Sequence, residues 1–160
     1  LNLAYFGVEF WVALSIGSVS LLADSADFLE DASINLLIFF AVVWSAAARA
    51  RTGMFLAGLL LVPAAAFLWS LYDKWLDPVP PAAFALTVTG AGALVVNMAA
   101  ALVLARFRHR SGSLTRAAFL SARNDAAANL GIILAGLATA FVWRSAWPDV
   151  IVGTLIAAMN

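Results

Sequence analysis

Residues 54–76 read MFLAGLLLVPAAAFLWSLYDKWL, an apolar stretch that has no charge before its last turn. A helix of roughly 20 such residues crosses the hydrocarbon core of a bilayer. Similar apolar stretches occupy about 1–17, 20–47, 82–105, 114–142 and 147–160. Together these segments predict an all-α, polytopic membrane protein that folds as a six-helix transmembrane bundle.

The composition excludes several classes of function. Hydrophobic residues make up 64% of the chain and charged residues 11%, whereas a soluble domain has about a quarter charged residues. The formal net charge is zero and no basic run alternates with aromatic residues, so a nucleic-acid partner is not expected. Cysteine is absent, which excludes disulfides, thiolate metal sites and Cys nucleophiles.

Short polar segments separate the predicted helices. They lie at residues 49–53 (RARTG), 77–81 (DPVPP), 108–112 (RHRSG) and 147–148 (WP), and their Pro, Gly and Arg content is typical of turns. Because the loops are short, we expect neighbouring helices to run antiparallel. The sequence begins and stops inside apolar runs, so we expect a single transmembrane domain over 1–160. Its first and last helices would be truncated, and these residues hold no cytoplasmic C-terminal domain.

Basic residues are unevenly distributed between the two sides of the predicted bundle. The connections after the second and fourth helices hold Arg49, Arg51, Arg106, Arg108, Arg110 and Arg116, and the alternate loops hold Lys74 and Arg144. Loops rich in Lys and Arg face the cytoplasm. We therefore expect both termini to be cytoplasmic. The preference for Arg and Ala suits the cytoplasmic (inner) membrane of a bacterium.

Acidic side chains interrupt the apolar segments. They are Glu9, Asp24, Asp27, Glu30, Asp31 and Asp125. An unpaired carboxylate near the bilayer centre costs about 2.5–3.5 kcal/mol, so something must compensate for these charges. On a helix that turns about 100° per residue, Asp24, Asp27 and Asp31 lie on one face together with Asn35. The second helix is therefore predicted to have an oxygen-rich face.

The predicted fifth helix has a matching face. Its polar residues are Ser121, Asp125 and Asn129, spaced by four, with Asn124 at the edge. The segment DAAANL at 125–130 resembles DASINL at 31–36, with Ser121 in the place of Asp27. If the two helices face each other, two such pairs of oxygen ligands would replace the water around a hard cation.

Polar residues in membrane helices also serve as hydrogen-bond partners between helices, and any single Ser or Asn here suits that role. Three aspartates on one face suit it poorly, because packing needs polarity and like charges repel one another. We therefore interpret the acidic face as functional. Close helix packing is predicted at three small residues, Gly90, Gly92 and Gly136.

The segment GSVSLLADSADFLED, residues 17–31, resembles the second-helix signature of the cation diffusion facilitators, the cation efflux family. The shared features are a Ser-rich start, Leu-Leu-Ala-Asp, and a His or Asp four residues before an Asp. Asp125, followed by small residues, resembles the second half of the family's site. Glu9 in the first helix and the segment 147–149 (WPD) also fit, so the resemblance covers almost the whole chain.

This resemblance implies a metal site whose ligands come from two helices. Asp27 and Asp31 would be the ligands from the second helix, and Asp125 a ligand from the fifth. Ser121 stands where most members have His or Asp, and a hydroxyl is a poorer ligand than imidazole. The site would therefore be weaker, would recruit Asn129, Asn124 or water, or would have lost transport.

The resemblance also implies the substrate. Family members carry zinc most often, and cadmium, cobalt, iron, nickel or manganese in other cases. A site made only of oxygen ligands shifts the expectation toward manganese without excluding zinc. Protons are the expected counter-ion, because carboxylates bind metal when ionised and hold protons when the dry site is empty. A homodimer is compatible with the resemblance.

Two other functions stay open at this point. Membrane phosphotransferases also bind metal through aspartates three and four residues apart. They have Gly and an Ala-Arg pair between these acids, which the segment 28–30 (FLE) lacks, so we do not expect an enzyme. The second alternative is a membrane scaffold or metal sensor with a degraded site, suggested by Ser121.

Overall fold

The computed structural model describes residues 1–40, 43–107 and 113–159, and the side chains of these residues except 104–107 and 113–122. Within these ranges the chain forms six helices and no strand: α1 (Asn2–Ile16), α2 (Val19–Phe40), α3 (Ala46–Leu76), α4 (Ala83–Phe107), α5 (Ser113–Phe141) and α6 (Trp147–Met159). The all-α architecture predicted from the sequence is therefore confirmed.

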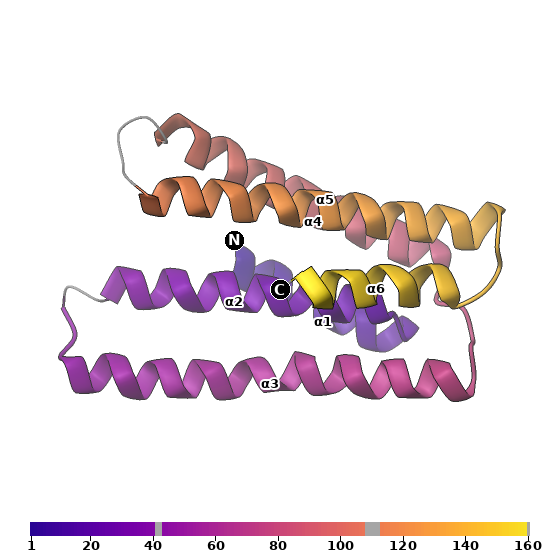
Figure 1. The fold of residues 1–160 in the computed structure, drawn as a ribbon, viewed down its shortest axis with the longest axis horizontal. Coiled ribbons are helices and arrows are strands. Elements are labelled where there is room, and N and C mark those ends of the chain that lie inside the picture. The colour runs from indigo at the N-terminus through magenta and orange to yellow at the C-terminus, as the bar shows by residue number, and fades with distance from the viewer. Residues whose placement is uncertain (41–42, 108–112, 160) are drawn as a thin grey trace.

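Helix α2 lies at the centre of the bundle (Figure 1). It contacts α1, α3, α5 and α6. In the view of Figure 1, α3 runs along one side of α2 and the α4–α5 pair lies on the other side, with α6 in front and α1 behind. The pairs α2–α3 and α4–α5 run antiparallel, as their short connections predicted. The acidic helix thus occupies the position with most neighbours.

Three helices are long and apolar enough to cross a membrane in the part of the chain that the structure describes. They are α3, Ala83–Val103 of α4 and Arg123–Phe141 of α5. Helices α1 and α6 are shorter and apolar. Helix α2 is 22 residues long, but its sequence contains four acidic residues. The protein is thus a membrane protein in which the most acidic helix is enclosed by apolar ones.

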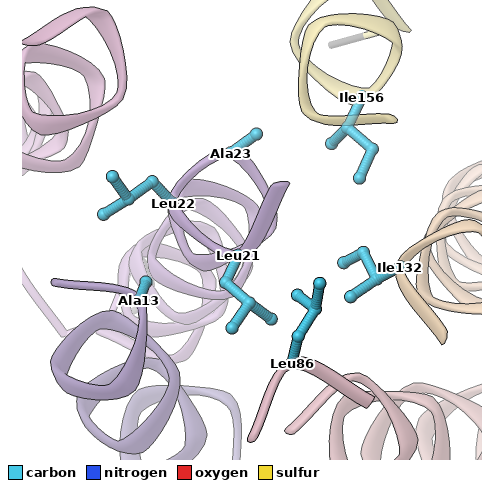
Figure 2. Packing of buried hydrophobic residues seen from close by; sticks show 7 residues of the cluster. All are labelled: Ala13, Leu21, Leu22, Ala23, Leu86, Ile132 and Ile156. Carbon is cyan, nitrogen blue, oxygen red and sulfur yellow. The ribbon is translucent and has the colours of Figure 1, made fainter. Parts of the chain in front are cut away.

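A cluster of buried apolar side chains joins five of the helices. Its members are Ala13 of α1, Leu21, Leu22 and Ala23 of α2, Leu86 of α4, Ile132 of α5 and Ile156 of α6. Figure 2 shows Leu21, Leu86 and Ile132 pointing toward one another. Leu22 points away from them, on the other side of α2. Because lipid is as apolar as these side chains, their close packing is what holds the helices together.

The connection between the second and third helices differs from the prediction. We predicted a break at residues 49–53, whereas α2 ends at Phe40 and α3 begins at Ala46 and continues through the predicted break. Ser45 caps α3 by accepting a hydrogen bond from the backbone N–H three residues later, at 3.2 Å. Arg is a good helix former, and one Gly inside a helix costs only about 1 kcal/mol. The N-cap at Ser45 therefore determines where α3 begins.

The predicted break at residues 108–112 lies outside the described residues. The other predicted boundaries agree with the structure to within a few residues.

Asp149, in the first turn of α6, is buried and caps the start of α2. Its carboxylate accepts hydrogen bonds from Ser18 Oγ and Val19 N, both at 2.7 Å, from Ser20 N at 3.2 Å, and from Ser20 Oγ. The first N–H groups of a helix have no partner within it, and the helix dipole favours an anion at this end. A carboxylate of α6 therefore fixes the start of α2.

Close backbone contact brings α6 and α2 together beside this cap. A Cβ atom added at Gly153 would lie 2.8 Å from the backbone N of Ser20, closer than real Cβ contacts allow. An added Cβ would also meet a neighbouring helix at Gly90, Gly92 and Gly136. The close packing predicted for these three glycines is confirmed.

We predict that Asp149→Ala lowers the stability of the folded protein by about 1–3 kcal/mol, because the N–H groups at the start of α2 lose their acceptor in a buried place. Thermal unfolding in detergent would measure the change. Asp73→Ala is the control, since Asp73 is exposed on α3, and it should leave the unfolding midpoint almost unchanged. Equal midpoints for the two variants would contradict the role given to Asp149.

Candidate metal site

The acidic residues of α2 lie at different depths in the bundle. Asp24 is fully buried, Asp27 and Asp31 are half-buried, and Glu30 is exposed. Asn35, on the same predicted face, is exposed. The oxygen-rich face is therefore buried in its first half and exposed near its end.

A small cavity lies between α2, α5 and α6, and two of the predicted acids meet there. Asp27 of α2 and Asp125 of α5 line it, together with Asn124 of α5. Apolar side chains complete the lining, namely Ala128, Ile156 and Met159. Asp125 is 9% exposed. Two carboxylates from different helices therefore line one small, largely apolar cavity.

Asp31 does not line this cavity. Its Oδ2 accepts a hydrogen bond of 2.9 Å from Asn2 Nδ2 of α1. It is nevertheless near enough to Asp125 for the two charges to interact. Asp31 thus lies at the edge of the region between α2 and α5, held by the first helix.

Asn129 is fully buried, but its amide is turned toward its own helix. Its Nδ2 donates a hydrogen bond of 2.8 Å to the backbone carbonyl of Asp125. Its Oδ1 has no hydrogen-bond partner among the described residues. The side chain of Ser121, which was also predicted as a ligand, lies outside the described residues. So does His109, the only histidine in the sequence.

Asn124 was placed only at the edge of the predicted α5 face, yet it lines the cavity that Asn129 does not. The signal available in the sequence was its position beside Asp125. Among the described residues, no group of three His, Cys, Asp or Glu side chains is arranged to hold a metal ion. The described part of the chain thus brings together Asp27 and Asp125, with Asn124 as a neutral oxygen or nitrogen donor.

Comparison with known protein families identifies the family to which this chain belongs. The family model for the cation efflux transmembrane domain matches residues 1–160, the whole of the sequence. This chain belongs to the cation efflux family. The family predicted from the second-helix segment is therefore confirmed. No curated protein matches the chain.

Membership of the cation efflux family gives the general function. The protein is a transporter of metal cations, and members of the family are transporters rather than enzymes.

Proposed function

We propose that this protein exports a divalent metal ion in exchange for protons, and that the ion binds between α2 and α5. The observation that carries the proposal is the cavity shared by Asp27 and Asp125. Two carboxylates beside one apolar space are costly in a membrane protein unless a cation or protons neutralise them. A doubly charged cation would offset both carboxylates at once.

The remaining ligands would come from the same two helices. Asp31 is one turn beyond Asp27, and its charge interacts with that of Asp125. Ser121 and Asn129 lie one turn on either side of Asp125. We infer that Asp31, Ser121 and Asn129 complete the coordination shell in a conformation in which α2 and α5 lie closer together. Asn124 is a further candidate, because it already lines the cavity.

The nature of these ligands bears on which metal is carried. All five proposed ligands are oxygen donors, and the chain has no cysteine and a single histidine outside this site. Zinc remains the first candidate by family resemblance, and cadmium, cobalt and iron are further ones. Oxygen ligands suit manganese better than they suit softer ions, so manganese is the second candidate.

Exchange against protons follows from the same carboxylates. When the ion leaves, ionised carboxylates in an apolar cavity would repel each other without compensation, and protons remove that charge. Rocking of the helices about the site would then open it alternately to each side of the membrane.

The cellular setting of this transport is also a proposal. The distribution of basic residues supports a cytoplasmic location for both termini, and the composition supports the inner membrane of a bacterium. A homodimer is consistent with the family. Export of the metal ion from the cytoplasm is part of the same proposal.

We predict that Asp27→Asn and Asp125→Asn each lower metal flux by about tenfold or more, because even a residue that only supports a ligand changes metal affinity 10–100-fold. Zinc or manganese uptake into liposomes would measure the flux. Asp77→Asn is the matched control, since Asp77 is exposed at the end of α3, and it should transport normally. Unimpaired flux in both cavity variants would refute the site.

Proton exchange is predicted to accompany each transport cycle. In liposomes that contain a pH-sensitive dye, metal uptake should move protons in the opposite direction and should accelerate when a favourable pH gradient is imposed. Protein with Asp125→Asn should produce no such signal. Metal uptake that neither changes the internal pH nor responds to the gradient would rule out antiport.

Replacing Ser121 by His should raise the affinity for zinc relative to manganese, because imidazole is a preferred zinc ligand and a hydroxyl is a poor one. Isothermal titration with each metal would measure the ratio. Ser15→His on α1 is the control, since Ser15 is exposed and far along the chain from the site. The same ratio in both variants would show that position 121 does not face the ion.

A further inference from the structure

A second pair of acids lies between α1 and α2, outside the cavity. Glu9 of α1 and Asp24 of α2 are both 0% exposed. Their carboxyl groups are within hydrogen-bonding reach of each other. None of their four oxygens receives a hydrogen bond from any other described residue. Two buried carboxyl groups therefore face each other, and no other described residue donates a hydrogen bond to them.

Among the side chains that the structure describes, the helices around this pair provide no compensating charge. On α1, the Tyr5 hydroxyl lies near both acids, but it donates its hydrogen bond to the carbonyl of Thr89, at 2.6 Å. On α3, the ammonium group of Lys74 donates to the carbonyl of Val79. Helix α4 has no charged residue over 83–103.

The other neighbouring groups are acidic or bound elsewhere. Asp27 of α2 interacts electrostatically with Glu9, and Asp125 of α5 with Asp24. Asp149 of α6 is occupied by the start of α2. Arg123 of α5 is exposed. Every described charge that faces the pair from a neighbouring helix is therefore negative.

Two ionised carboxylates are not stable in such a place. Removing each ion from water costs several kcal/mol, and their mutual repulsion adds to this cost. One proton between the two groups removes one charge and forms a charge-assisted hydrogen bond, which is among the stronger kinds. Pairs of carboxyl groups at such short range titrate as a unit that shares its proton.

A metal ion fits this place less well than a proton. Zinc takes four ligands and calcium-like ions take six or more, whereas only two carboxyl groups meet here. Neither residue lines the cavity beside Asp27 and Asp125. A proton needs no cavity and only the two oxygens that it joins.

We propose that Glu9 and Asp24 form a proton-binding site, separate from the metal ligands, that holds a proton between the two carboxyl groups. The role of this proton site in antiport rests on the proposed function, whereas the site itself does not. A metal cation at Asp27 and Asp125 would offset the negative charge that now faces the pair, which favours the ionised pair and releases its proton. Binding of the metal would thus expel the proton, which is the sign that antiport requires.

Infrared spectroscopy of the purified protein in lipid nanodiscs tests the site directly. At neutral pH the wild-type protein should show the carbonyl-stretch band of a protonated carboxyl group. Glu9→Gln should lose the part of this band that comes from the pair, because the amide can donate to Asp24 and leave it ionised, whereas any part that comes from protons at Asp27 and Asp125 should remain. Asp24→Asn should lose the same part for the same reason, and it keeps the test valid if the first variant does not fold. Asp73→Asn, at an exposed position on α3, should keep the band.

A band of equal strength in the wild type and in both variants would overturn the proposal, and so would its absence from the wild type. Titration with zinc gives a separate readout. Zinc should weaken, in the wild type, the part of the band that Glu9→Gln removes, and should leave that part unchanged in Asp125→Asn, in which the metal site is damaged. A band that responds to Glu9→Gln but never to zinc would retain the proton site and reject its coupling to the metal.

Discussion

Carboxyl groups buried among apolar helices impose the main constraint on this structure, because each must be neutralised by a partner within the bundle. Asp149 is stabilised by four hydrogen bonds at the start of α2. Asp31 accepts a hydrogen bond from α1. Glu9 and Asp24 face each other and receive no hydrogen bond from another described residue, and Asp27 shares a cavity with Asp125. A carboxylate that keeps the same hydrogen-bond donors has a structural role, whereas a carboxylate whose proton or cation can be exchanged is suited to transport.

The position of α2 connects these roles. Asp149 and the close contact at Gly153 fix where α2 begins, and the helical repeat then determines the direction of each acid along it. Asp24 and Asp27 are less than one turn apart on α2. Asp24 faces Glu9 of α1, and Asp27 lines the cavity with Asp125 of α5. A movement of α2 would therefore affect the Glu9–Asp24 pair and the cavity beside Asp125 together. This arrangement gives a physical reason why a proton and a metal ion would be exchanged by a single helix.

The sequence predicted the helices, the membrane setting and the family, because these depend on composition, local periodicity and a short motif. It misplaced the break after α2, because Arg-rich segments resemble loops while Ser45 supplies the actual helix cap. Spacing by four placed Asn129 beside Asp125, but packing turned its amide toward its own backbone. The meeting of Glu9 with Asp24 depends on how α1 lies against α2, which no periodicity within one helix reveals.

The central claim is that acids from α2 and α5 bind the transported ion. Its most direct test is an anomalous difference map from crystals of the protein soaked in zinc or manganese. The account predicts a single strong peak at about 2.0–2.2 Å from carboxylate oxygens of Asp27 and Asp125. A peak bound only by Glu9 and Asp24, or a bound ion with no contact to Asp125, would contradict it.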